Sequence, residues 1–141
     1  MSKIRSGNLI IEQPEEIGME NAILSKPEIK NYSEAKTSVS SNAGAATFDI
    51  DNGNVFSITL SENVTFTFSN PPTSGKAGSL TMILTQDSTP RTVTWPGSVK
   101  WDSGTAADVS TADAIYILTF ITVDGGTTWY GFLSGSEMAT P

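Results

Sequence analysis

The sequence predicts an all-β protein, an antiparallel β-sandwich or jelly roll of about eight strands, preceded by an extended N-terminal arm. Three observations support this prediction. After residue 46, short runs alternate between apolar and polar residues, which is the period of strands with one buried face. Seventeen of the 18 threonines lie in the same part of the chain, and threonine is favoured in strands. Turn-forming residues separate the runs, with no helical stretch between them.

Residues 1–46 are predicted to form an N-terminal arm and linker, and residues 47–141 the β-sandwich domain. The first part holds 11 of the 23 charged residues, and Pro14 and Pro27 interrupt any long helix. Its apolar residues keep neither a helical nor a strand period, yet they are too many for a solvated tail. We therefore expect an arm that docks on another surface through Leu9, Ile10, Ile11, Ile17, Met19, Ile23, Leu24, Ile29 and Tyr32. A floppy terminal extension is the alternative interpretation.

The first strands of the β-domain show the alternation most clearly. Residues 47–50 lead into a turn at residues 51–54, where Asp, Asn and Gly gather. Residues 55–60 and 64–68 then place Phe, Ile, Leu or Val on one face and Ser or Thr on the other. Two consecutive prolines end the second of these runs, and residues 79–86 (SLTMILTQ) form the next predicted strand.

The segment RTVTWPGSVKW, residues 91–101, contains two of the three tryptophans around a Pro-Gly pair. This pair matches the centre of a type II turn between two short strands. Each tryptophan follows a valine by two positions, so the two side chains share one face of a strand. Aromatic residues at strand spacing mostly face inward, which favours core anchors over a platform for a ligand.

The last two strands are predicted at residues 115–123 and 127–133, joined through residues 124–126 (DGG), a strong hairpin signal. The first of them, IYILTFITV, is apolar on both faces, whereas a two-layer sandwich buries only one face of each strand. The second face needs a cover, which the arm, a long loop or another subunit can provide. A homotrimer would cover the face and would multiply a weak attachment by avidity.

The composition excludes several classes of function. The net charge is −7, with 15 acidic and 8 basic residues, which disfavours binding to nucleic acid and to anionic membranes. No apolar run is long enough to span a membrane, so we expect no membrane insertion. Because cysteine and histidine are both missing, disulfides, thiol nucleophiles, the usual zinc sites and imidazole-dependent triads are excluded. We expect neither a cofactor nor a metal site.

The acidic residues form no recognisable catalytic or metal-binding motif. An EF-hand loop counted from Asp49 fails, because the positions that require an oxygen ligand, a glycine and a final glutamate hold other residues. Asp102, Asp108 and Asp113 lie in a loop region, where capping of turns is favoured over cation binding. No pair of carboxylates sits in a motif typical of glycoside hydrolysis. We therefore expect no catalytic residues and no enzymatic activity.

Three segments carry a resemblance to a known family: GNVFSITLSENVTFTFSNPP (53–72), RTVTWPGSVKW (91–101) and ILTFITVDGGTTWYGF (117–132). They resemble a β-rich module of virion proteins in tailed bacteriophages, especially in tail-fibre-type chains. The similarity extends from about Ile29 to Leu133. One departure is that WDSGTAAD follows the second tryptophan, where relatives have a turn rich in glycine and proline.

The resemblance implies a noncatalytic structural role in the virion and trimeric assembly. On this interpretation the chain is a fibre-like or decoration protein, assembled in the host bacterial cytoplasm, whose arm contacts other virion proteins of the tail or capsid. The alternative is a carbohydrate-binding module that acts in adsorption to the host surface. Its candidate glycan contacts are Trp101, Tyr116, Trp129 and Tyr130. The two functions can coexist in one molecule, and a polysaccharide-degrading enzyme is a distant third.

Overall fold

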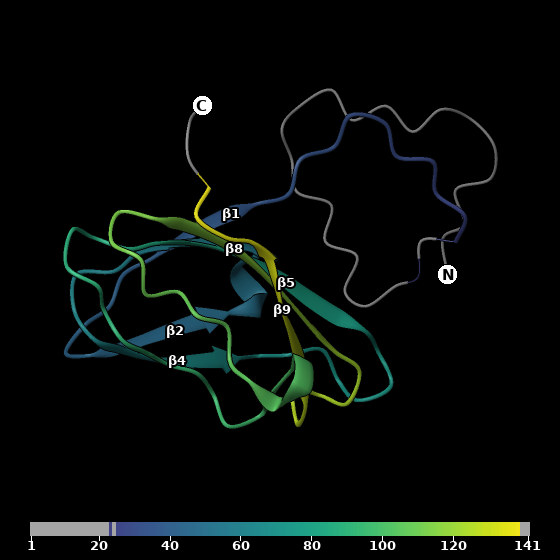
Figure 1. Ribbon diagram of the computed structural model, residues 1–141. Coiled ribbons are helices and arrows are strands. Elements are labelled where there is room, and N and C mark those ends of the chain that lie inside the picture. The colour runs from purple at the N-terminus through teal and green to yellow at the C-terminus, as the bar shows by residue number, and fades with distance from the viewer. Residues whose placement is uncertain (1–22, 24, 139–141) are drawn as a thin grey trace. The chain divides into compact units, whose positions relative to one another are not determined.

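Figure 1 shows the computed structural model, which describes residue 23 and residues 25–138. The chain divides into two units, Met1–Tyr32 and Ser33–Pro141, and the second unit holds every described strand. Two short 3-10 helices, η1 and η2, interrupt the strands. In chain order the elements are β1 (Lys36–Val39), β2 (Ala45–Asp49), η1 (Ile50–Asn52), β3 (Val55–Thr59), β4 (Val64–Ser69), β5 (Gly78–Thr85), β6 (Val93–Thr94), β7 (Val99–Trp101), η2 (Asp102–Gly104), β8 (Ile115–Thr122) and β9 (Trp129–Gly135).

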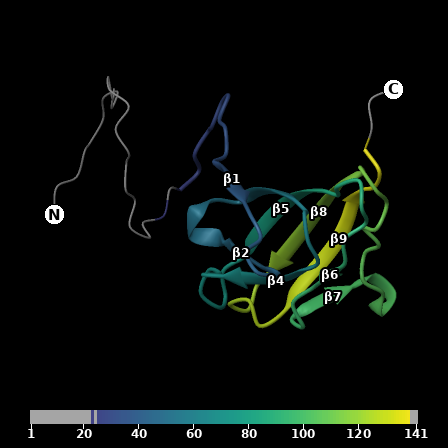
Figure 2. The ribbon, with the colours of Figure 1, turned by 90° about the vertical axis from the view of Figure 1, so that its left-hand side faces the viewer.

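The strands form two sheets packed one over the other. The larger sheet has the order β1-β3-β5-β8-β9-β7, and the smaller one has the order β2-β4-β6. Figure 2 shows the neighbouring strands β5, β8 and β9 of the larger sheet, with β1 toward its other edge. The all-β class predicted from the sequence is confirmed, and the described residues contain no α-helix.

The first six strands are placed alternately in the larger and the smaller sheet. Successive strands alternate between the sheets, and β3, β4, β5 and β6 each pair in parallel with the strand two positions earlier. β7 also pairs in parallel, with β9, while β8 pairs antiparallel with β5 and with β9. The larger sheet is therefore mixed and the smaller sheet is wholly parallel, whereas the sequence pattern suggested antiparallel sheets throughout. The reason is that a period of two reports which face of a strand is buried and carries no information about strand direction.

The β unit begins before residue 47, which is where the sequence pattern placed its start. Residues 38–46, expected to be a linker, form the end of β1, a tight turn and the start of β2. Asn42 and Ala45 exchange backbone hydrogen bonds of 2.9 and 3.1 Å across this turn. Ala43 and Gly44 have φ values of 52° and 76°, a left-handed conformation that small residues tolerate better than β-branched ones.

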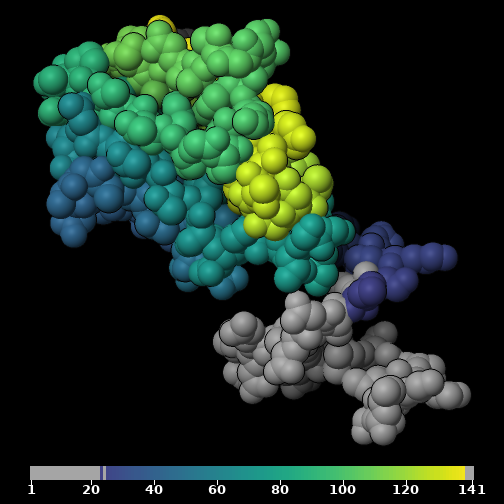
Figure 3. All heavy atoms as spheres, turned by 90° about the horizontal axis from the view of Figure 1, so that it is seen from below, coloured from purple at the N-terminus to yellow at the C-terminus, as the bar shows by residue number. Residues whose placement is uncertain are grey.

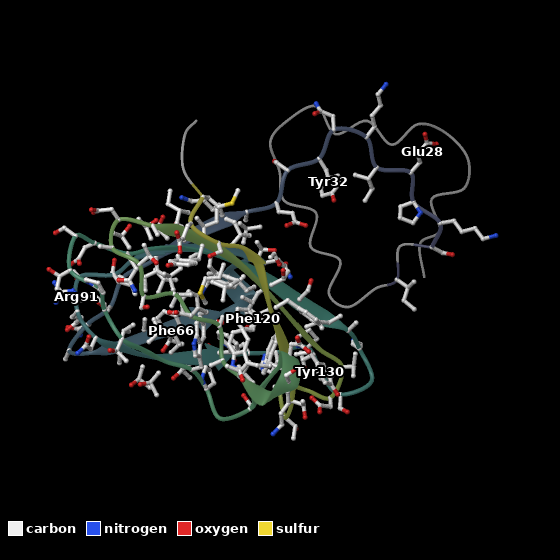
Figure 4. The ribbon with its side chains drawn as sticks, in the orientation of Figure 1. Glu28, Tyr32, Phe66, Arg91, Phe120 and Tyr130 are labelled. Carbon is white, nitrogen blue, oxygen red and sulfur yellow. The ribbon has the colours of Figure 1, made fainter. Side chains whose placement is uncertain are left out.

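The core lies between the two sheets, where aromatic rings from both sheets meet. The ring of Phe48 in β2 packs edge-on against Phe56 in β3 and Phe66 in β4, with centroid distances of 5.6 and 4.9 Å. Figure 4 shows Phe66 and Phe120 between the layers. Along β3, β5 and β8 every second residue is buried, and in β4 Val64 and Phe66 are buried while Phe68 is half-buried. The alternation in the sequence predicted the buried faces of β3 and β4. The largest fully buried side chains are Trp129, Tyr116, Phe48, Phe56, Phe66, Phe120, Ile58, Leu60, Leu80, Met82, Leu84 and Leu118.

Trp95 and Trp101 pack against this core at its edge. Their ring centroids lie 5.0 Å apart, with Phe66 5.3 Å from Trp95 and Phe120 5.7 Å from Trp101. Both tryptophans are half-buried. Each ring therefore anchors the short strands β6 and β7 on the core while one side stays at the surface.

Gln86, directly after β5, is a buried polar residue that ties two loops together. Its Nε2 donates hydrogen bonds to the carbonyl oxygens of Arg91 and Val109, at 2.8 and 2.6 Å. Its Oε1 accepts a hydrogen bond of 2.9 Å from the backbone N–H of Arg91. Because all these partners are backbone groups of loops, the side chain replaces secondary structure that the loops lack.

Candidate functional site

A groove lies at the edge of the larger sheet, beside β9 and beyond the end of the shorter strand β7. β7 pairs with β9 only over Trp129–Gly131, whereas β9 continues to Gly135. The chain turns away in η2, where Ser103 and Gly104 have φ values of 52° and 73°. The uncovered part of β9 leaves a groove of about 580 Å³, lined by Lys100, Trp101, Asp102, Thr105, Ala107, Tyr130, Gly131, Phe132 and Leu133.

The groove combines aromatic walls with two opposite charges. Tyr130 and Phe132 are 48% and 53% exposed, and Trp101 contributes its outer side. Lys100 and Asp102 are exposed at its rim. In Figure 3 the green segment that holds β7 and η2 adjoins the yellow C-terminal strand. Aromatic faces beside a carboxylate and an ammonium group suit a ligand with both apolar and hydroxyl surfaces.

The groove lacks the arrangement that glycoside hydrolysis requires. Among its lining residues, Asp102 is the one carboxylate, whereas the reaction needs two positioned acids about 5–10 Å apart. Within the part of the chain that the structure describes, no group of three or more His, Cys, Asp or Glu side chains could hold a metal ion. The geometry therefore supports binding and gives no support to catalysis.

The structure brings together two of the four residues predicted to contact a glycan. Trp101 and Tyr130 line the groove, whereas Tyr116 and Trp129 are only 1% and 2% exposed. The hydroxyl of Tyr116 accepts a hydrogen bond of 2.9 Å from the backbone N–H of Thr111 inside the protein. Tyr116 and Trp129 therefore cannot contact a ligand in this fold, and that part of the prediction is corrected.

Sequence reasoning missed Phe132 as a wall of the groove, although a signal for it existed. Phe132 follows Tyr130 by two positions in the same strand, so the two side chains share a face. Lys100 and Asp102 flank Trp101 directly in the sequence. No pattern in the sequence shows, however, that β9 extends beyond the end of β7 and thereby leaves the groove open.

Of the three aspartates predicted to cap turns, Asp102, Asp108 and Asp113, only Asp108 accepts such side-chain hydrogen bonds within the described residues, and Asp124, which was not predicted as a cap, makes similar contacts. The Oδ1 atom of Asp108 accepts hydrogen bonds from the backbone N–H and the hydroxyl of Ser110, at 3.0 and 2.6 Å. The side-chain bond from Ser110 lowers the pKa of Asp108 below its usual value. In the turn before β9, the backbone N–H of Thr128 likewise lowers the pKa of Asp124. These carboxylates are occupied by turn contacts.

The loop after β5 contains a surface ion pair. The guanidinium of Arg91 contacts the carboxylate of Asp87 at 2.9 Å. Its hydrogen bonds to that carboxylate are the main cause that lowers the pKa of Asp87. Both side chains are partly exposed, so the pair contributes little to stability.

The residues predicted for the attachment arm are only partly described. Ile23, Ile29 and Tyr32 are strongly exposed, as a set of apolar side chains without an internal partner would be. Figure 4 labels Tyr32 and Glu28 in this segment. The other predicted arm residues lie outside the described residues: Leu9, Ile10, Ile11, Ile17, Met19 and Leu24.

Within the described residues, no helix is long and apolar enough to cross a membrane. No curated protein and no solved structure matches the chain. One protein family does match, over residues 40–128, and its description is "Putative phage tail fibre C-terminal domain". The matched stretch includes β2 to β8 and covers more than half of the sequence. The chain therefore belongs to this family of phage tail fibre domains and has a structural role in a phage virion.

Proposed function

We propose that the protein is a noncatalytic, trimeric, fibre-like or decoration protein that its N-terminal arm anchors to the tail or capsid of the phage particle. Membership of the tail fibre family carries this proposal. Two features of the chain support the anchoring by the arm and the association into a trimer. Exposed apolar residues of the arm, such as Ile29 and Tyr32, offer contacts for another virion protein. The outer face of the larger sheet, whose strands β3, β5, β8 and β9 contain no charged residue, offers contacts for other copies of the chain.

The arm is tested by separating attachment from folding. In a full-length variant, Leu9, Ile10 and Ile11 are replaced by serine, and in a second variant residues 1–30 are deleted. We expect both variants to keep the thermal transition of the β unit, because every described strand lies after residue 32. Both should be missing from purified particles, as measured by quantitative immunoblotting. A serine variant of Thr65, an exposed residue of β4 that lies outside both the arm and the larger sheet, is the control and should be incorporated.

Normal incorporation of the arm variants into particles would contradict the anchoring role. Loss of the thermal transition in the deletion variant would instead show that the arm is part of the folded domain. Because the serine variant keeps the full chain, it distinguishes these two results.

A second candidate function is binding of a host-surface glycan, and the groove between β7 and β9 favours it. Trp101 and Tyr130, two of the residues predicted from the sequence, wall the same groove as Asp102. Sugars bind such sites by stacking a ring face on an aromatic side chain and donating hydroxyl hydrogen bonds to a carboxylate.

Binding of the full-length protein to a glycan array tests this second function. Replacement of Asp102 by alanine should weaken binding about tenfold or more, because a hydrogen bond to a charged group is lost. An alanine at Asp51, an exposed aspartate in η1 outside the groove, should leave binding unchanged. Absence of any bound glycan, or equal binding by both variants, would reject the groove as a glycan site.

A further inference from the structure

The outer face of the six-stranded sheet, the face turned away from the smaller sheet, differs from a solvated protein surface. None of the residues in β3, β5, β8 and β9 is charged, although the whole chain carries a net charge of −7. A sheet face in contact with water usually displays charged and polar side chains. The absence of charged residues from these four adjacent strands makes this face suited to contact with another protein surface and not to full exposure to solvent.

The burial pattern identifies the side chains on this outer face. In β5 and β8 the fully buried residues alternate with outward ones, and the register pairs outward Ile83 with Ile117. Further along β8, outward Ile121 lies opposite Tyr130, and Thr119 lies opposite Phe132. Ile121, Tyr130 and Phe132 are all at least 40% exposed. The outer face therefore presents apolar side chains on three neighbouring strands, with Ser and Thr residues such as Thr81 and Thr119 between them.

The smaller sheet of the same molecule provides the contrast. Its outward residues are small or polar, including Thr47 in β2, Thr65 and Thr67 in β4, and Thr94 in β6. No large apolar side chain is exposed on these described strands. This composition is ordinary for a solvated sheet face. The two outer faces thus differ in chemistry although both belong to one β unit.

We propose that the outer face of the larger sheet, centred on β5 and β8, packs against a second copy of this chain. This inference rests on the trimer of the proposed function and names the surface that forms it. Because Tyr130 and Phe132 belong to this surface, it is an alternative to glycan binding in the groove that they line. In a closed three-fold ring each copy contacts its neighbour through two different patches, and this face supplies one of them.

Charge is the reason why a second copy is the occupant. Copies that each carry −7 repel one another, and an uncharged face is where that repulsion is least direct. Lysines border the face on two sides: Lys36 in β1 pairs with outward Val55, and Lys100 in β7 pairs with Tyr130 and has Asp102 beside it. An acidic neighbour can supply carboxylates to these rim lysines. The chain itself is such an acidic neighbour.

The proposal is tested with full-length variants that place a charge on either outer face. Ile121→Glu and Phe132→Glu place a carboxylate on the larger sheet at exposed positions, and Thr67→Glu places the same group on the smaller sheet. Size-exclusion chromatography with light scattering gives the mass of each protein over a dilution series, and circular dichroism checks that each is folded. We expect the wild type and Thr67→Glu to have the same mass. The oligomers of Ile121→Glu and Phe132→Glu should dissociate at protein concentrations at least 100-fold higher than the wild-type oligomer does. The reason is that an unpaired charge is costly in an apolar contact.

The milder substitution Phe132→Ser keeps the test valid if a glutamate variant does not fold, and it should shift dissociation at least tenfold. If the wild type is an oligomer and the variants of the larger sheet keep its mass, this face is not the interface, while the trimer itself still stands. If the wild type has the mass of one chain at micromolar concentration, both the interface and the trimer are overturned.

Discussion

Replacing Trp129 with alanine is expected to lower the free energy of unfolding by about 3–5 kcal/mol, the usual cost of removing a large buried aromatic side chain. Trp129 opens β9 and is almost fully buried. Its ring packs against Phe68 of the opposite sheet at a centroid distance of 5.2 Å. The substitution would leave a cavity between the two sheets, at the place where β9 joins β7.

Chemical denaturation at a fixed protein concentration measures this effect, since association changes apparent stability. Lys100→Ala is the control, because Lys100 pairs with the next residue of β9 and is exposed. It should change the free energy of unfolding by less than about 1 kcal/mol. A Trp129→Ala variant as stable as this control would contradict the assignment of Trp129 to the core.

Gln86→Leu is expected to destabilise the protein by about 3 kcal/mol, although leucine has nearly the same volume and is more apolar. The substitution removes the hydrogen-bond partners of two backbone carbonyls and one backbone N–H in the loops that Gln86 joins. A buried polar group without a partner costs about 1–3 kcal/mol, more than the apolar side chain gains. Hydrogen exchange should show faster opening of the loop around Val109.

Arg91→Ala is the matched control for Gln86→Leu. It removes the side chain of the ion pair with Asp87 and keeps the backbone groups that Gln86 contacts. Because the pair lies at the surface, its loss should cost less than about 1 kcal/mol. If the two variants are equally stable, the hydrogen bonds of Gln86 do not hold these loops.

The buried faces of the strands could be predicted from the sequence, because alternation reports directly which side chains face the core. Phe56 and Ile58 in β3, and Val64 and Phe66 in β4, are buried as their spacing predicts. The direction of the strands could not be predicted in this way. The segment between β1 and β2 has the length of a hairpin turn, yet it carries the chain from one sheet to the other.

The candidate site could be predicted only in part. Trp129 and Tyr130 are neighbours in one strand, so only one of them can face the core, and the sequence does not say which. β8 presents the same difficulty, because both of its faces are apolar; the structure buries Tyr116, Leu118 and Phe120. The surplus of apolar residues on the other face was visible in the sequence. Which surface of the folded molecule they form required the register of β5, β8 and β9.

The mass of the full-length wild-type protein in solution tests the central claim most directly, namely that copies of this phage fibre domain associate into a trimer. Light scattering at micromolar concentration should give about 45 kDa, three times the 14.9 kDa of one chain. This result is expected because β3, β5, β8 and β9 of the larger sheet carry no charge and expose apolar side chains that association would cover. A mass near 14.9 kDa would contradict the account, since that face would then be stable in water.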